Sequence, residues 1–150
     1  VGLPFSIAFA KGREVVPKTI GLNHLGRTVR DLDQTTAFFA HVLGWDVTAR
    51  DASYPRTTVT DGALRLTLWQ VQVDAPAAFD RKNALGLHHL AFEIADEATF
   101  NELAATCSAH DGFLTEFITE FMGQGHRRHM KFAQPGRSRI RMLQAVAVAT

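Results

Sequence analysis

The stretch Ile20–Leu25 (IGLNHL) recurs 65 residues later as Leu85–Leu90 (LGLHHL), and His24 falls on His89. Both copies are expected to lie at the strand that opens each half. A repeat at this spacing indicates that one structural unit occurs twice along the chain. The chain is therefore predicted to consist of two similar halves, each opening on a strand that carries a histidine.

A second pair of similar segments closes the two halves. Arg65–Gln70 (RLTLWQ) resembles Arg139–Gln144 (RIRMLQ), and both segments have the composition of a strand. The two pairs of segments occur in the same order along the chain. This shared order supports a duplication.

One helix is expected after the first strand of each half. Asp31 is a suitable N-cap for a helix running to about Leu43, and Gly44 follows its end. Asp96 caps the second predicted helix, which closes near Gly112. Apolar spacing predicts that the first helix buries Leu32, Phe39, Val42 and Leu43, and that the second buries Phe100, Leu103 and Cys107.

Three further strands are expected after each helix. The predicted strands are Trp45–Arg50, Arg56–Thr60 and Ala63–Val73 in the first half, then Phe113–Phe121, His129–Ala133 and Arg139–Val146 in the second. Turn signals at Asp61-Gly62 and Pro135-Gly136 place a hairpin before the last strand of each half. Each half therefore has the order βαβββ.

Strand alternation predicts which side chains share a face. Leu66 and Leu68 are expected to pack under the helix, as is His88 in the second half. The opposite face is predicted to hold His24, His89, Arg65, Thr67, Trp69, Arg139 and Arg141. Proteins do not bury so many polar groups without partners, so this face is expected to be open, concave and able to hold a ligand.

Composition narrows the class of protein. The 150 residues are 46% hydrophobic and 21% charged with a net charge of +1, which is typical of one soluble domain without the basic field that nucleic acid requires. No apolar run reaches membrane-spanning length, and no signal peptide is expected. The single cysteine, Cys107, fits a reducing compartment, so a cytoplasmic location is expected.

Three motifs in order resemble the vicinal oxygen chelate family, which includes glyoxalase I, bleomycin-resistance proteins and extradiol dioxygenases. They are Asn23–Trp45 (a strand with a His, an Asp-Leu helix start, an aromatic pair and Leu-Gly), Gly86–Ile94, and the closing hairpin Gln134–Met142. The resemblance covers roughly residues 19–146. It implies an α+β fold in which two paired βαβββ modules form a cupped, mostly antiparallel sheet with helices on the outer face.

The resemblance also implies a metal site, from which this chain departs. The family commonly uses four ligands, two His or Gln and two Glu, to hold a divalent ion that acts as a Lewis acid. The two histidine positions fall on His24 and His89, whereas the glutamate positions fall on Thr67 and Arg141. Thr and Arg are not normal ligands, so the expectation is either no cofactor or a divalent ion held by His24 and His89.

Two functions remain open on the sequence. The first is a glyoxalase- or dioxygenase-like enzyme, a lyase, isomerase or dioxygenase, acting on a small, oxygenated, anionic substrate. The second is a small-molecule binding and sequestration protein of the bleomycin-resistance type. The assigned catalytic residues are His24, His89 and, by a likeness to an acid–base His of extradiol dioxygenases, His129; the assigned substrate-binding residues are Arg65, Thr67, Trp69, Arg141 and His126.

The same reading divides the chain 1–150 as one domain. It comprises an N-terminal extension (1–18), a first module (19–73), a linker (74–84) and a second module (85–147). The expected partners are a small-molecule ligand and a second copy of the chain in a homodimer, with neither nucleic acid nor membrane.

Overall fold

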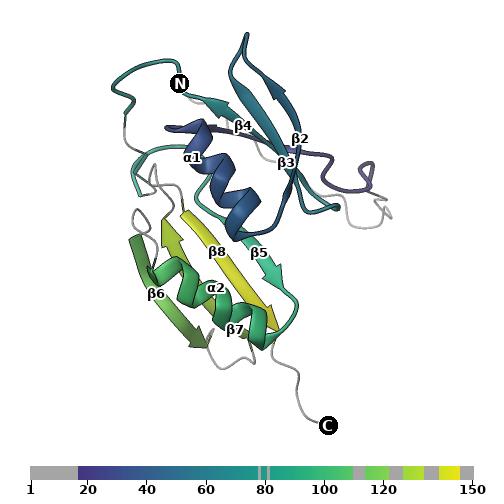
Figure 1. Cartoon of the computed structure of the whole chain (residues 1–150), viewed down its shortest axis with the longest axis vertical. Helices are drawn as coiled ribbons and strands as arrows, with labels where there is room; N and C mark the ends of the chain where they lie inside the picture. Colours follow the sequence, from purple (N-terminus) through teal and green to yellow (C-terminus); the bar gives the residue numbers. More distant parts are fainter. Residues whose placement is uncertain are drawn as a thin grey trace, which may run out of the picture.

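A computed structural model describes residues 17–77, 79–80, 82–109, 114–121, 127–133 and 139–145. Two βαβββ units follow one another along the chain (Figure 1). The elements of the first are β1 (Leu25–Val29), α1 (Leu32–Ala37), η1 (Phe38–Val42), β2 (Asp46–Asp51), β3 (Arg56–Thr60) and β4 (Arg65–Gln70). Those of the second are β5 (Leu90–Ile94), α2 (Glu97–Ala109), β6 (Leu114–Phe121), β7 (Arg127–Ala133) and β8 (Arg139–Ala145).

The two units have the same strand order and the same register. Their sheets run β1-β4-β3-β2 and β5-β8-β7-β6, with one parallel pair in each and the other neighbours antiparallel. Leu25 lies opposite Leu66 in the first sheet, and Leu90 lies opposite Ile140 in the second. The predicted α+β fold of two βαβββ modules is therefore confirmed.

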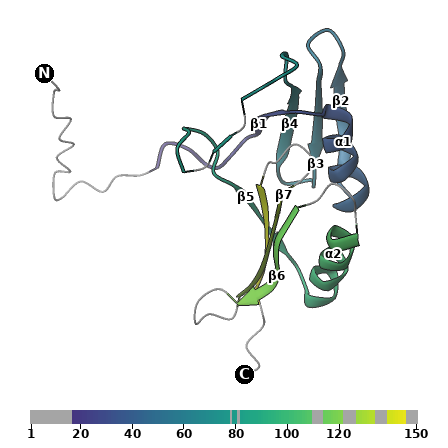
Figure 2. The same cartoon turned by 90° about the vertical axis from the view of Figure 1, so that its left-hand side faces the viewer.

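Both helices lie on the same side of the sheets, so in the described segments no helix covers the other side, which we call the uncovered face (Figure 2). Strand alternation explains this layering, because Leu66, Leu68, Ile140 and Met142 are fully buried on the helix side. None of the helices in the described segments is long and apolar enough to cross a membrane.

Both predicted helix caps are present. Asp31 Oδ1 accepts a hydrogen bond from the Gln34 amide at 2.8 Å, and Asp96 Oδ1 accepts one from the Thr99 amide at 2.8 Å. These bonds satisfy backbone donors that have no partner inside the helix. The hydrogen bond from the Thr99 backbone amide is also the chief cause that holds the pKa of the Asp96 carboxyl below its usual value.

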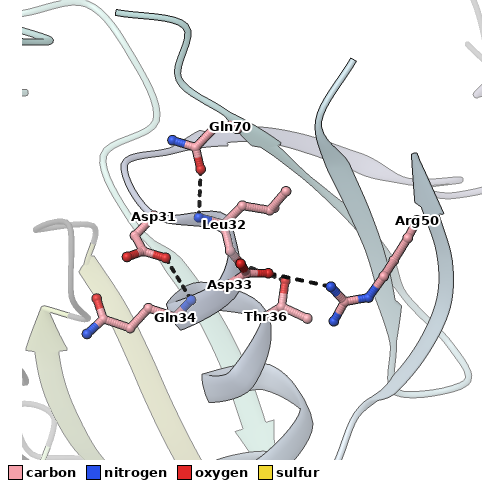
Figure 3. A network of polar contacts seen from close by, with 7 residues as sticks. All are labelled: Asp31, Leu32, Asp33, Gln34, Thr36, Arg50 and Gln70. Atoms are coloured by element: carbon pink, nitrogen blue, oxygen red, sulfur yellow. Dashed lines mark hydrogen bonds and ion pairs between the residues drawn. The ribbon is translucent and has the colours of Figure 1, made fainter. Parts of the chain in front are cut away.

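A side-chain bridge fixes the start of α1 against the last strand of its module (Figure 3). Gln70 Oε1 accepts from the Leu32 amide at 2.8 Å, while its Nε2 donates to the Arg30 carbonyl at 2.7 Å. In the first turn of α1, a carboxylate oxygen of Asp33 lies 3.5 Å from Nη1 of Arg50 on β2. Contacts with β4 and with β2 therefore hold α1 over the sheet.

The first helix differs from the sequence expectation in its second half. It continues as the π-helical turn η1, in which the Leu43 amide donates to the Phe38 carbonyl five residues earlier at 3.2 Å. The helical segment still ends before Gly44, whose φ of +70° suits glycine. Phe38 and Phe39, in the widened turn, are both buried.

The aromatic core joins the two halves. The ring of Phe39 lies 5.0 Å from Trp45 and 6.2 Å from Phe92 of the second half, measured between ring centroids. Phe38 lies 5.6 Å from Phe132 of β7. Because these contacts cross from one module to the other, the two modules share one hydrophobic core.

The first strand of each module starts later than expected. His24 and His89 immediately precede β1 and β5 and lie outside the paired residues of the ladder. Strand alternation therefore does not determine the direction of these histidines or of the residues before them. His88, expected on the packing face, is exposed, and that expectation is wrong. The second helix ends at Ala109, whereas its expected closure near Gly112 and the hairpin at Pro135-Gly136 lie outside the described residues.

Arg27 of β1 has a partly buried guanidinium for which the described part of the chain provides no anion. Its Nη1 atom is buried and, among the described residues, has no hydrogen-bond partner. Burial lowers the pKa of Arg27 to about 10, so the group is still charged at neutral pH. An uncompensated buried charge opposes folding.

Replacing this cation is expected to stabilise the protein. Arg27→Met removes the charge and keeps an unbranched side chain, which should raise the free energy of unfolding by about 1–2 kcal/mol. Urea unfolding at pH 7 measures the change, and Arg30→Met, which alters an exposed neighbour, serves as the control. A loss of stability on replacing Arg27 would show that its charge has a partner in solution.

Cys107 is expected to be chemically inert in the folded protein. Its side chain is buried in α2, and burial raises the pKa of the thiol to about 11, which suppresses the reactive thiolate. A thiol-specific disulfide reagent at pH 8 should therefore react fully only after unfolding in guanidinium. Rapid reaction of the native protein would contradict the burial of α2.

Candidate functional site

The uncovered face of the first sheet carries the polar residues that the sequence assigns to a ligand. Along β4, Arg65, Thr67 and Trp69 alternate with the buried Leu66 and Leu68. The three therefore point away from the helices, toward the side left open in Figure 2.

Asn23 links His24 to Arg65. Its Oδ1 atom lies 2.8 Å from Arg65 Nη2 and 2.9 Å from His24 Nδ1. A guanidinium can only donate, so the Asn23 atom between the two groups must be the amide oxygen. His24 Nδ1 must then donate to that oxygen as well, which leaves Nε2 of the neutral ring with the free lone pair.

Two hydroxyl groups occupy the middle of this face. Thr67 lies opposite Gly26 of β1 and Thr58 of β3, and the Thr58 and Thr67 hydroxyl oxygens are 3.3 Å apart. Both residues are half-buried. The position implied for a family glutamate thus carries a hydroxyl that already has a neutral partner.

An aromatic patch, defined as Tyr54, Arg56 and Trp69, lies at the other end of β4. The ring centroids of Tyr54 and Trp69 are 4.7 Å apart with planes tilted by 47°, and Arg56 Cζ lies 5.1 Å from the Trp69 ring centroid. Arg56 also pairs with Asp51 at 3.4 Å. The Trp69 Nε1 atom reaches across to Gly26, 3.6 Å from where a Cβ would stand.

The second module places its assigned residues separately. His89 Nδ1 lies 2.8 Å from His88 Nδ1, and both rings are exposed ahead of β5. Arg141 is placed by its backbone, opposite Ala91 of β5 and Lys131 of β7. Arg141 therefore has the same register position in its module as Thr67 in the first.

His129 lies on β7, opposite Leu143 of β8 and Glu120 of β6. Both of its ring nitrogens are shielded from solvent. The predicted acid–base role requires that a ligand can reach one of these nitrogens. Two residues further along β7, Lys131 lies opposite Arg141. His126 lies outside the described residues.

The structure thus joins His24 to Arg65 and keeps Thr67 and Trp69 on the same face, while His89 is hydrogen-bonded within its own module. Among the described residues there is no group of three His, Cys, Asp or Glu side chains able to hold a metal ion. The idea that all four aligned positions share one hollow stays a prediction.

Four residues of this face were not assigned from the sequence: Asn23, Tyr54, Arg56 and Thr58. Three of the four could have been suspected from sequence position or from strand pairing. Asn23 directly precedes His24, and Arg56 and Thr58 have the cross-strand positions of Trp69 and Thr67. A pairing register for the predicted strands would have identified the last two.

A cavity of about 340 Å³ lies elsewhere, on the helix side between the modules. Its lining is mixed: apolar residues such as Leu43, Phe92, Leu103 and Met142 stand beside the polar residues Asp61, Glu93, Thr99 and Glu102. This cavity and the uncovered sheet face are alternative places for a ligand, and any experiment on the site has to distinguish them.

Comparison with known proteins places the chain in a family. Residues 21–142 match the model of the Glyoxalase/Bleomycin resistance protein/Dioxygenase superfamily. None of the curated proteins matches.

Solved structures share the fold at low sequence identity. A glyoxylase/bleomycin resistance protein/dioxygenase domain from Frankia sp. EAN1pec has a TM-score of 0.74 and 18% identity, covering 88% of this chain and 96% of that one. A lactoylglutathione lyase from Agrobacterium tumefaciens has a TM-score of 0.64 and 18% identity, with coverages of 85% and 96%.

A third neighbour is a mutant of the fosfomycin resistance protein FosX from Listeria monocytogenes, complexed with Mn(II) and 1S,2S-dihydroxypropylphosphonic acid. It has a TM-score of 0.60 and 17% identity, with coverages of 87% and 93%. The duplicated βαβββ register, these neighbours and the match over residues 21–142 agree. The chain belongs to the glyoxalase/bleomycin resistance protein/dioxygenase superfamily, whose members have the vicinal oxygen chelate fold.

Proposed function

We propose that this protein binds a small, oxygenated, anionic substrate on the uncovered face of its first sheet and exchanges a proton with it. The observation that carries the proposal is the Asn23–His24–Arg65 cluster. Arg65 supplies a cation whose hydrogen-bond partner is a neutral amide, so its charge is available to an anion. His24 presents Nε2 beside it as a base.

The remaining first-module residues fit the same ligand class. Thr67 offers a hydroxyl within the Thr58–Thr67 pair, suited to a neutral substrate oxygen. Trp69 offers an indole ring for the substrate body. A charge-assisted bond to Arg65 orients the substrate, which leaves His24 to remove or return a proton.

The second-module assignments remain part of this proposal. His89 and His129 are additional candidates for proton transfer, and Arg141 and His126 for substrate binding. Their support is the repeated register, which gives Arg141 the position of Thr67 and sets His89 two residues before Ala91, as His24 is set before Gly26.

The aligned residues do not fit a divalent metal ion. They provide two imidazoles, a hydroxyl and a guanidinium, whereas catalytic sites usually provide three protein ligands of the His, Asp, Glu or Cys type. The Arg65 guanidinium, linked to His24 through Asn23, would repel a cation held by that imidazole. No step of the proposed chemistry therefore passes through a metal.

One relative supports the ligand class. The FosX structure contains a dihydroxypropylphosphonic acid, which is a small oxygenated anion. The likeness to that protein is one of fold, so the match in ligand class adds to the Arg65 observation and does not replace it.

A second candidate is binding without chemistry. The substitution of Thr67 and Arg141 at the two positions where relatives commonly carry glutamate favours a sequestration protein. Both candidates predict the same contacts with Arg65. They differ in whether His24 changes the ligand.

A screen followed by product analysis separates them. Small oxygenated acids that raise the melting temperature are incubated with protein and followed by proton NMR. The enzyme proposal predicts turnover that His24→Gln abolishes while the ligand still stabilises the variant. His41→Gln, which alters an exposed histidine on η1, should leave turnover intact. Stabilising ligands that the wild type never consumes would leave only the binding function.

We also propose that two copies pair through the segments before β1 and β5. Leu22 and Leu87 are 65% and 50% exposed there, and β1 and β5 are the edge strands of their sheets. Leu22→Lys should shift the protein to monomers in sedimentation velocity, with Val47→Lys on β2 as the control. A wild-type monomer at micromolar concentration would end this part. A cytoplasmic location is likewise a proposal.

A further inference from the structure

Arg65 has a different kind of partner from the arginines of β2 and β3. Arg50 pairs with Asp33 and Arg56 pairs with Asp51, both through carboxylates, whereas Arg65 donates to the amide of Asn23. A neutral partner orients the guanidinium without neutralising it. The positive charge of Arg65 is therefore held in a fixed position at one end of this sheet face.

Trp69 lies four residues further along the same strand. At the strand rise of about 3.3 Å per residue, the Cα atoms of Arg65 and Trp69 are about 13 Å apart, with Thr67 midway between them. All three residues belong to the face opposite Leu66 and Leu68. A ligand that reaches from one end to the other must be elongated, with an anionic group and a separate body.

The aromatic patch at the far end offers more surface than Trp69 alone. Tyr54 is 56% exposed on the β2–β3 turn, and its ring is inclined to that of Trp69 by 47°. Arg56 contributes a guanidinium beside the indole ring. Aromatic rings and a guanidinium attract a planar π system, because the edge of such a ring is positive and its face is negative. The edge can contact the face of another ring, and the face can contact a cation.

We propose that the substrate is an aromatic acid, with its anionic group at Arg65 and His24, a short linker over Thr67 and its ring on the aromatic patch. This inference rests on the proposed function and adds the ring, the linker length, and Tyr54 and Arg56 as specificity-determining residues. Ring stacking of this type corresponds to an affinity gain of about tenfold.

A matched ligand series tests the ring and the linker. The probes are 4-phenylbutyrate, its saturated analogue 4-cyclohexylbutyrate, and benzoate, which lacks the linker. Isothermal titration should give 4-phenylbutyrate an affinity about tenfold higher than either of the other two. Cyclohexyl is the more hydrophobic group, so simple apolar burial predicts the opposite order for the first pair.

Three variants test the same inference by substitution in the protein. Tyr54→Ala, at an exposed turn, should weaken 4-phenylbutyrate several-fold and leave 4-cyclohexylbutyrate unchanged, whereas Phe79→Ala, at another exposed aromatic, should change neither. Trp69→Leu should remove the preference for the aromatic ring. Ligand binding should also change the fluorescence of Trp69, because the other tryptophan, Trp45, is buried.

The outcomes separate this inference from the proposed function. Equal affinity for the aromatic and saturated acids, with loss of both in Arg65→Gln, would overturn the aromatic subsite while the anion site stands. If Arg65→Gln leaves the affinity for every acid unchanged, both the aromatic subsite and the anion site are overturned.

Discussion

Phe39→Ala is expected to lower the free energy of unfolding by about 3–5 kcal/mol, which is a large part of the stability of a domain of this size. The Phe39 ring is fully buried and contacts Trp45 in its own module and Phe92 in the other. Its removal leaves a cavity at the junction. Because the core is shared, we expect both modules to unfold together at a lower temperature.

Calorimetry and urea unfolding measure this effect. Phe79→Ala, which truncates a ring that is 48% exposed, is the matched control and should change stability by less than about 0.5 kcal/mol. Two separate transitions in Phe39→Ala, with the second module unaffected, would show that the modules fold independently and that the shared core is wrong.

Arg65→Gln is expected to reduce the affinity for small anionic ligands by about 10- to 100-fold. The substitution removes a charge-assisted hydrogen bond worth about 1.5–3 kcal/mol. Arg65→Lys should retain part of the affinity, since it keeps the charge and loses the planar fork. Added salt should weaken wild-type binding, because the site is open to solvent.

The control for this prediction is Arg50→Gln. It removes the same charge from an exposed residue of the same sheet that pairs with Asp33 of α1 on the helix side. Titration calorimetry at fixed ionic strength should show the about 10- to 100-fold loss of affinity for Arg65→Gln and no loss for Arg50→Gln. Equal effects of the two variants would mean that only overall charge matters.

Repetition and alternation made the fold predictable. The match of His24 with His89 and of Arg65 with Arg139 carried enough information to predict two βαβββ modules, and the N-caps at Asp31 and Asp96 set both helix starts. The start of β1 was misjudged because residues before the ladder have strand-like composition but no pairing partner. The composition of a segment does not show whether that segment pairs with another strand.

The site was predictable only in outline. Alternation along β4 was sufficient to place Arg65, Thr67 and Trp69 on the uncovered face. The Asn23 bridge depends on how two side chains meet across 42 residues of sequence, and the Tyr54–Trp69 contact depends on the β2–β3 turn. Both are tertiary contacts that local pattern does not encode.

Chemical-shift mapping tests the central claim most directly. In a ¹H–¹⁵N NMR titration with 4-phenylbutyrate, we expect the largest shifts at the Asn23 side-chain amide, Arg65 Nε and the Trp69 indole, all on the uncovered face of the first sheet. Shifts confined to Phe92, Leu103 and Met142 would place the ligand in the helix-side cavity instead. That result would contradict the site proposed for this protein.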